Sequence, residues 1–247
     1  MRFAPQSIKD WARQNMASAL GLPYPKYGVP AELVKSIGSD VALNVVDVGA
    51  HAGQFSDGLE RLCGIGKAVL CEPNPEKAEG LRKRFAAPKF AVFEGAISAR
   101  DGTDAFHVAN FDAISSLMPI LGSSPDLGDL DTSTKRTIEV KSRALDSLLD
   151  ELAFGPVDLL KIDVQGAELL VLEGASRTLT RTARVWVEVS LKPLYEGSAL
   201  LPAVYQFLVE HGFGLSAVEQ GYRAPSGELL QCDLLFLPFG RLGDWPC

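Results

Sequence analysis

From residue 43 onward, short apolar runs alternate with segments whose apolar residues recur every three or four positions. The apolar runs predict buried strands at 43–49, 67–72, 90–97, 157–164 and 184–190. The periodic segments predict helices at 54–63, 75–85, 145–152, 167–173 and 202–211. Regular alternation of strand and helix predicts an α/β fold with a doubly wound, mostly parallel sheet.

Elsewhere the alternation is interrupted. Residues 105–109 and 137–142 predict strands, and so do 213–218 and 231–237 near the end of the chain. Residues 110–135 are rich in Ser, Gly, Asp and Pro and show no clear period, which predicts a long functional or disordered loop.

The first 42 residues differ from the rest of the chain. Residues 6–20 have a helical pattern, the segment 21–30 holds three prolines and predicts an extended arm, and 31–37 predicts a short helix. The arm either packs against the core or serves as a lid or a homodimer contact. We therefore expect an N-terminal helix with a Pro-rich arm, a main domain and a C-terminal tail, at residues 1–42, 43–238 and 239–247.

Composition narrows the function classes. The 247 residues carry a net charge of −7 and no long basic run, which argues against a nucleic-acid partner. The four cysteines form no C-x-x-C pair and suggest no disulfide framework, so a reducing, cytoplasmic setting is expected. No run approaches 18 apolar residues, so no membrane span is expected.

A glycine-containing turn follows the first predicted strand. Asp47, Gly49 and Gly53 form the pattern D-x-G-x-x-x-G ahead of a helix, a typical nucleotide site in such sheets. Gly49 permits a sharp turn, and Gly53 is expected to let backbone N–H groups approach a ligand. Glu72, at the end of the second strand, is placed to accept hydrogen bonds from ribose hydroxyls. An ordinary tight turn with a surface glutamate is the alternative.

Charged residues also interrupt two later apolar strands. Lys161 and Asp163 share one face of their strand, and a buried lysine requires a paired carboxylate. A carboxylate at a neighbouring strand end is the expected partner, and Glu188, which interrupts the strand at 184–190, is a candidate. Two interpretations stay open. In the first, these groups lie at the carboxyl edge of the sheet as catalytic residues or as ligands of a divalent cation. In the second, they form a structural ion-pair network. Glu168, in the first turn of a helix, either acts in the site or favours the helix dipole.

Together these motifs resemble the FkbM-type methyltransferases, a branch of the class I S-adenosylmethionine-dependent enzymes with a Rossmann-like fold. The resemblance covers roughly residues 43 to 238 and rests on Val46–Phe55, Leu145–Leu148, Asp158–Glu168, Val171–Ala175 and Val187–Val189. It implies S-adenosylmethionine as cofactor and O-methylation of a hydroxyl on a small natural product or a sugar.

The resemblance also implies roles for individual residues. Cofactor binding would involve Asp47, Gly49, Ala50, His51, Gly53, Glu72, Glu94, Ala96, Ile97 and Asp163. The substrate would lie near Lys161, Ser115, Ser116 and Leu117. Two departures stand out, because Gln165 replaces a common glutamate and His51 a frequent asparagine.

Methyl transfer to an alcohol needs help in removing the hydroxyl proton. Asp163 is the preferred base, with His51 and Glu188 as further catalytic candidates. No acidic cluster has a recognisable metal-binding spacing, so no metal is predicted. Two alternatives stay open: an NAD(P)-dependent oxidoreductase, which would need a G-x-G-x-x-G that this chain lacks, and a non-catalytic partner-binding module. The acceptor, a small molecule or glycan, has no readable motif.

Overall fold

The computed structural model describes residues 27–121 and 131–241. The predicted helix at 6–20, most of the arm and most of the tail lie outside these residues. The main sheet contains strands β1 (Leu43–Val48), β2 (Ile65–Glu72), β3 (Phe90–Glu94), β7 (Leu159–Ile162), β8 (Val185–Ser190), β9 (Phe213–Gln220) and β10 (Gln231–Pro238). The helices are α2 (Ala31–Ile37), α3 (Gln54–Leu62), α4 (Pro75–Arg84), α5 (Leu145–Glu151), α6 (Glu168–Glu173), α7 (Ser176–Leu179) and α8 (Leu201–Glu210).

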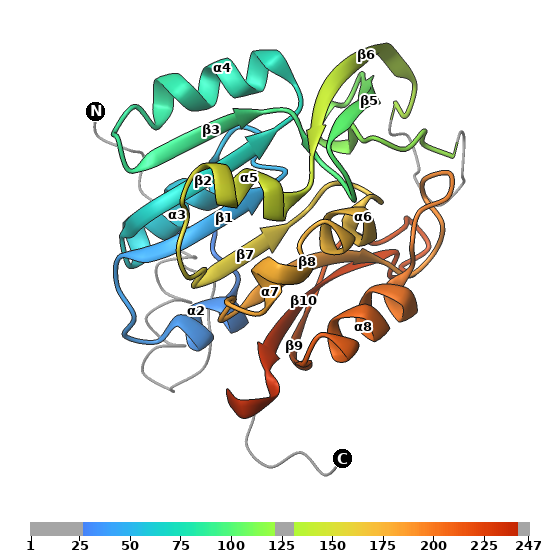
Figure 1. Ribbon diagram of the computed structural model, residues 1–247. Helices are drawn as coiled ribbons and strands as arrows, with labels where there is room; N and C mark the ends of the chain where they lie inside the picture. The colour runs from blue at the N-terminus through green and yellow to red at the C-terminus, as the bar shows by residue number, and fades with distance from the viewer. Residues whose placement is uncertain (1–26, 122–130, 242–247) are drawn as a thin grey trace, which may run out of the picture.

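The seven strands follow the order β3-β2-β1-β7-β8-β10-β9 (Figure 1). The first five pair in parallel, and β10 runs antiparallel to both its neighbours. The predicted doubly wound, mostly parallel sheet is therefore confirmed. The chain order reverses between β1 and β7, which is where open α/β sheets bind ligands beyond the strands' carboxyl ends.

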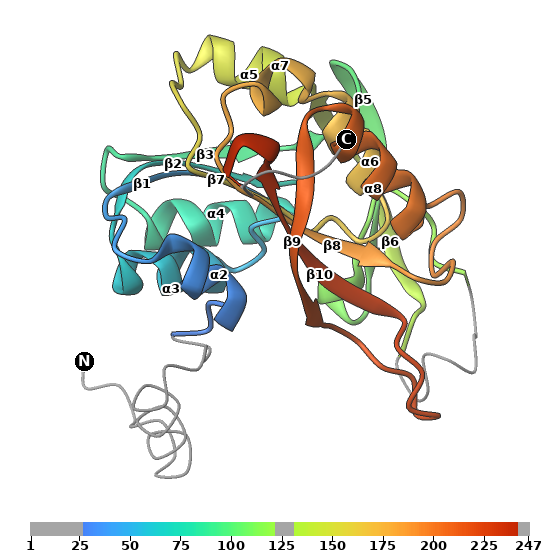
Figure 2. The ribbon, with the colours of Figure 1, turned by 90° about the horizontal axis from the view of Figure 1, so that it is seen from below.

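Helices cover both faces of the sheet, with α2, α3 and α4 on one side and α5, α6, α7 and α8 on the other (Figure 2). Alternating side chains of each strand enter one of two apolar cores. On β1, Val46 and Val48 face the α5–α8 side, while Val45 faces the α2–α4 side. Asp47 therefore points to the same side as Val45. By the same alternation Lys161 follows Leu159 onto that face.

The predicted strand at 90–97 is two strands, because the chain bends at Gly95. A side chain there would place its Cβ 2.5 Å from the carbonyl oxygen of Lys141 and 2.6 Å from the ring of Phe93. After the bend, β4 (Ala96–Ile97) leaves the main sheet and pairs with β6 (Thr134–Arg143). Glycine thus allows the close approach at which the chain changes sheets.

A second sheet, β4-β6-β5, stands beyond the carboxyl ends of the main strands (Figure 1). β5 (Gly102–Ala109) pairs antiparallel with β6, and both are longer than the sequence pattern predicts. The connection between them contains the short helix η1 (Asp112–Ile114), and residues 122–130 of the predicted loop lie outside the described part. After β10 comes η3 (Phe239–Arg241). None of the helices in the described ranges is long and apolar enough to cross a bilayer.

Candidate active site

A cavity of about 480 Å³ lies at the carboxyl edge of the sheet, where the strand order reverses. This volume is within the range of about 300–1,000 Å³ that is usual for small-molecule sites. Its walls come from residues 27–30 ahead of α2, the β1–α3 turn, the end of β2, the β3–β4 bend, the segment after β5, and the region of strands β7, β8 and β10. Segments far apart in the sequence therefore meet around one space.

The β1–α3 turn depends on Gly49, as its position in the motif predicts. Gly49 has φ +79°, and a Cβ there would lie 1.8 Å from the carbonyl oxygen of Asp163. Left-handed backbone favours glycine, and the contact with β7 leaves no room for any side chain. Gly49, Ala50 and His51 then form one wall of the cavity.

Glu72 enters the same cavity from the end of β2. Its two carboxylate oxygens accept hydrogen bonds from the backbone N–H groups of His51 at 2.8 Å and Asn74 at 2.9 Å. The residue is only 5 % exposed, and burial raises the pKa of its carboxyl group, although these hydrogen bonds oppose the rise. Each oxygen keeps a further lone pair for a ligand hydroxyl.

Gly53 serves helix packing, and the predicted approach of a ligand to the neighbouring N–H groups stays a prediction. Gly53 is not part of the cavity lining. A Cβ at this position would lie 2.4 Å from the ring of Phe85 and 2.9 Å from Leu81, and Gly53 also has φ +79°. The glycine is needed because α3 begins against the end of α4.

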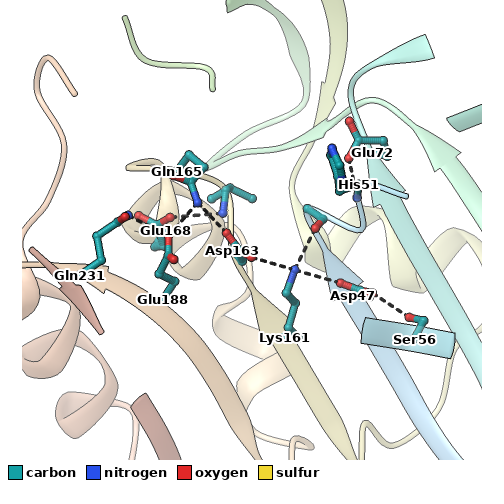
Figure 3. Close-up of polar contacts among 12 residues, drawn as sticks. Asp47, His51, Ser56, Glu72, Lys161, Asp163, Gln165, Glu168, Glu188 and Gln231 are labelled. Carbon is teal, nitrogen blue, oxygen red and sulfur yellow. Dashed lines mark hydrogen bonds and ion pairs between the residues drawn. The ribbon is translucent and has the colours of Figure 1, made fainter. Parts of the chain in front are cut away.

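Lys161 lies between two carboxylates, Asp47 and Asp163, with its Nζ 3.3 Å from each (Figure 3). Nζ also donates a hydrogen bond to the carbonyl oxygen of Gly49 at 2.8 Å. Burial alone would lower the pKa of Lys161, but Asp163 and Asp47 together raise it above its ordinary value. The predicted pairing of Lys161 with Glu188 is wrong, because the adjacent strand β1 supplies Asp47 instead.

Asp47 is completely buried and does not line the cavity. Its Oδ2 accepts a hydrogen bond of 2.7 Å from the hydroxyl of Ser56. The predicted contact of Asp47 with the cofactor is therefore indirect: the carboxylate holds Lys161, which itself reaches the cavity.

Gln165 connects Asp163 to Glu188. Its Nε2 donates to Asp163 Oδ1 at 2.9 Å and to Glu188 Oε2 at 2.7 Å, and its Oε1 accepts from the hydroxyl of Tyr195 at 2.9 Å. Glu188 Oε2 also accepts from Gln231 Nε2 at 2.8 Å (Figure 3). Burial, reinforced by Asp163, raises the pKa of Glu188 well above its ordinary value. Glu188 lies behind Gln165 and outside the cavity lining, so the predicted direct catalytic contact is not what the structure shows.

Glu168 closes the turn after β7. Its Oε1 accepts from the backbone N–H of Val164 at 3.2 Å, and both oxygens accept from that of Gly166 at 3.0 Å. Burial raises the pKa of Glu168 to about 7. The residue therefore orders the turn that carries Gln165, which has φ +58°.

At the adenine end predicted by the resemblance, Ala96 and Ile97 line the cavity but Glu94 does not. Glu94 points to solvent and forms an exposed ion pair with Arg82 at 2.8 Å. Gly95, at the bend between the strands, lines the cavity instead.

The two predicted substrate serines differ in position. Ser115 lines the cavity, together with Leu117, and its hydroxyl accepts from the N–H of Ala109 at 3.1 Å. Ser116 is 1 % exposed and donates to the carbonyl oxygen of Gln165 at 2.7 Å. Ser116 therefore ties the β5–β6 connection to β7 and cannot contact a substrate as predicted.

Several cavity residues were not predicted. Asp112 of η1 forms an ion pair with Lys77 of α4, and its Oδ1 lies 3.4 Å from Nε2 of His51. The hydrogen bond from Lys77 keeps the pKa of Asp112 low. Trp186 and Asp233 line the opposite wall. Asp233 interrupts an apolar strand in the same way as Glu188, so this signal could have identified it.

Burial, reinforced by Asp163, raises the pKa of Asp233 to about 7. Across residues 27–121 and 131–241, no three His, Cys, Asp or Glu side chains are grouped so as to hold a metal ion.

Residues 47–215 match the family description "Methyltransferase FkbM domain". The chain belongs to the FkbM methyltransferase family. The family's cofactor is S-adenosylmethionine, so the protein is an S-adenosylmethionine-dependent methyltransferase, and the oxidoreductase alternative is not favoured.

Two relatives illustrate the likeness. The chain is 31 % identical over 170 residues to "2-O-methyltransferase NoeI" of Sinorhizobium fredii (strain NBRC 101917 / NGR234), covering 66 % of this chain and 70 % of that protein. The crystal structure of methyltransferase FkbM from Methylobacillus flagellatus KT superposes with a TM-score of 0.50 at 15 % identity. That match covers 78 % of this chain and spans 43 % of the other, and it supports the class I methyltransferase fold.

The cavity suits this cofactor. Its volume accommodates a nucleoside with a short side chain, and Glu72 presents two acceptor oxygens at the end of β2. Apolar side chains near the β3–β4 bend, such as Ile97, suit a flat base. The close approach of Gly49 to the backbone of Asp163 holds the turn at the cavity wall.

Proposed function

We propose that this FkbM-family enzyme transfers a methyl group to a hydroxyl oxygen of a small molecule or a sugar. The observation that supports this most directly is the carboxylate of Asp163, which lines the cavity at the strand next to the glycine turn. A proton acceptor in this position is what an alcohol nucleophile requires. The likeness to a protein named a 2-O-methyltransferase agrees with oxygen as the acceptor atom.

Asp163 is the proposed general base. Lys161 holds one of its carboxylate oxygens and Gln165 the other, so the group is fixed before the acceptor binds. When bound, S-adenosylmethionine supplies an electrophilic methyl group on a sulfonium. Asp163 then takes the hydroxyl proton of the acceptor while the apolar walls exclude water.

The remaining site residues have supporting roles in this proposal. Glu72 would hold the ribose hydroxyls, and the backbone of Gly49 and Ala50 would face the methionine part. His51, which lines the cavity beside Asp112, is the second candidate for proton transfer. Glu188 positions Asp163 through Gln165.

The cofactor assignment is tested by calorimetric titration with S-adenosylmethionine, S-adenosylhomocysteine and NAD⁺. We expect the first two to bind the wild type and NAD⁺ not to bind. The Glu72→Ala variant should lose most of this affinity, because the ribose hydroxyls lose their acceptor. Glu94→Gln removes a surface carboxylate outside the cavity and should bind as the wild type does. Binding of NAD⁺ alone would overturn the proposal.

The reaction is tested with S-adenosylmethionine that carries a tritiated methyl group and a panel of sugars and small alcohols. We expect label in an alkali-stable product, because an ether resists hydrolysis whereas a methyl ester does not. Label only in an ester or an amine would contradict O-methylation of a hydroxyl.

We further propose residues 43–238 as the catalytic domain, preceded by the helix and arm and followed by a tail. The thiols of Cys63, Cys71 and Cys232 are free, which supports a reducing, cytoplasmic setting. The net charge of −7 supports an acceptor that is not a nucleic acid. Light scattering during size-exclusion chromatography tests the homodimer that the arm suggests.

A further inference from the structure

Part of the cavity wall lies outside the region that matches the family. Tyr27, Gly28 and Pro30 precede residues 47–215, and Asp233 follows them. The residues placed for the shared cofactor, from Gly49 to Ile97, lie inside the match. The outer walls are therefore available for contacts with the acceptor.

Asp233 is the one ionisable carboxylate in these outer walls. It lies in the middle of β10, opposite Glu188 of β8 and Glu219 of β9 in the strand register. By strand alternation it shares the face of Leu235, which belongs to the core on the α2–α4 side, and it lines the cavity there. Asp163 approaches the same space from β7.

The protein leaves most of the hydrogen-bonding capacity of Asp233 unused. Within the parts of the chain that the structure describes, no lysine, arginine or histidine forms an ion pair with it; Lys161, the nearby cation, pairs with Asp47 and Asp163. The nearby Trp186 side chain favours the charged form of the Asp233 carboxyl group and so opposes the rise in its pKa. A carboxylate can accept about four hydrogen bonds, so acceptor positions remain toward the cavity.

The surroundings indicate which ligand suits these positions. Asp163 and Asp233 both line the cavity, and they come from the two strands on either side of β8. Hydroxyl groups donate to carboxylates. A compound with hydroxyls on neighbouring carbons can donate to both.

We propose that Asp233 binds the acceptor by accepting a hydrogen bond from a second hydroxyl, next to the one that is methylated, and that the acceptor is accordingly a sugar-like polyol. This inference rests on the proposed function, because Asp163 must act on the reacting hydroxyl. Asp233 recognises the neighbouring hydroxyl and so sets which position of the ring meets the base.

The test uses the full chain saturated with S-adenosylhomocysteine, and saturation-transfer NMR titration of three probes: methyl α-D-glucopyranoside, methyl α-D-mannopyranoside and methyl β-D-galactopyranoside. Cyclohexylmethanol, a ring of similar size with one hydroxyl, serves as the comparison ligand. Asp233→Asn is compared with Glu219→Gln, which removes a carboxylate on the paired strand that does not line the cavity. Calorimetry with S-adenosylhomocysteine and thermal unfolding check that each variant is folded.

We expect at least one glycoside to bind the wild type and the Glu219→Gln variant with affinities that agree within about twofold. At pH 8, above the pKa of about 7 of the Asp233 carboxyl group, Asp233→Asn should weaken that glycoside at least about tenfold, since hydrogen bonds to a charged group are among the stronger ones. It should leave cyclohexylmethanol and S-adenosylhomocysteine unchanged.

Equal glycoside affinity in the Asp233→Asn variant would overturn the role of Asp233. Binding of S-adenosylhomocysteine without binding of any glycoside would overturn the polyol acceptor while leaving methyl transfer intact. Failure of the wild type to bind S-adenosylhomocysteine would overturn the proposed function itself, and this inference with it.

Discussion

The two ends of the cavity are built by different means. At the β1–β2 end, backbone N–H groups of His51 and Asn74 fix Glu72, and Gly49 lets the turn pack against the backbone of Asp163. At the β7–β10 end, side chains hold one another, with Gln165 between Asp163 and Glu188. Backbone contacts suit a cofactor that never changes, whereas a side-chain network can be altered by substitution to suit another acceptor.

Lys161 connects the two ends. It pairs with Asp47 on β1 and Asp163 on β7, and it donates to the carbonyl oxygen of Gly49 in the turn. A substitution of Lys161 should therefore affect both ends of the cavity, whereas a substitution of another site residue should affect only the end at which it lies.

The largest effect is expected for Asp163→Asn. Asparagine preserves the shape but cannot take up the hydroxyl proton, so kcat for methyl transfer should fall by about 10²–10⁴-fold. The Kd for S-adenosylhomocysteine should stay within about threefold, since the β1–β2 end is untouched. Tritium transfer and calorimetry measure the two quantities. Asp150→Asn, which breaks an exposed ion pair with Arg177, should alter neither. An unchanged kcat in Asp163→Asn would show that another group is the base.

Lys161→Met should reduce the free energy of unfolding by about 3–5 kcal/mol, because it leaves the buried Asp47 without its counterion. Urea denaturation measures this loss. The double variant with Asp47→Asn should recover part of the stability, since the uncompensated charge is gone. Lys89→Met, at a half-exposed pair with Glu60, should cost less than about 1 kcal/mol. Equal losses for the two lysines would refute a special role for Lys161.

Gln165→Glu should reduce the free energy of unfolding by about 1–3 kcal/mol, because a third carboxylate replaces the amide that donates to Asp163 and Glu188. A Gln206→Glu control makes the same change on the exposed surface of α8, beside Glu210, and should cost less than about 0.5 kcal/mol. Chemical denaturation at pH 8 compares them. A more stable Gln165→Glu variant would mean that the network tolerates the third carboxyl group, or that the three carboxyl groups share a proton.

The last prediction concerns the pH dependence of stability in Glu168→Gln. Glu168 has a folded pKa of about 7, whereas an unfolded glutamate has one of about 4.3. Between these values the folded chain binds more protons, so its stability falls as pH rises through this window. Glutamine at this position should make the loss of stability with pH less steep. The part of the loss that comes from Asp233, whose pKa is also raised to about 7, should remain. Urea unfolding at pH 5 and pH 8 measures the slope. An unchanged dependence of the free energy of unfolding on pH would mean that groups other than Glu168 cause it.

The cofactor end was largely readable from the sequence. Gly49 and Glu72 stand at the ends of the first two strands, and local spacing alone brings them to one edge of a parallel sheet. The packing role of Gly53 was not predicted, because its neighbour Phe85 comes from another part of the chain that no local pattern identifies. Glu94 was misplaced for a similar reason, since the chain leaves the sheet at Gly95.

The sequence by itself therefore determined the doubly wound fold and the glycine turn with its carboxylate, because both depend on short-range periodicity and spacing, and its motifs carried the resemblance to the FkbM family. Only the tertiary structure decided that Asp47, not Glu188, neutralises Lys161, that Gln165 separates two carboxylates, and that Asp233 enters the cavity. Those contacts join strands distant along the chain. Their partners are set by strand order and register, which hydrophobic periodicity does not encode.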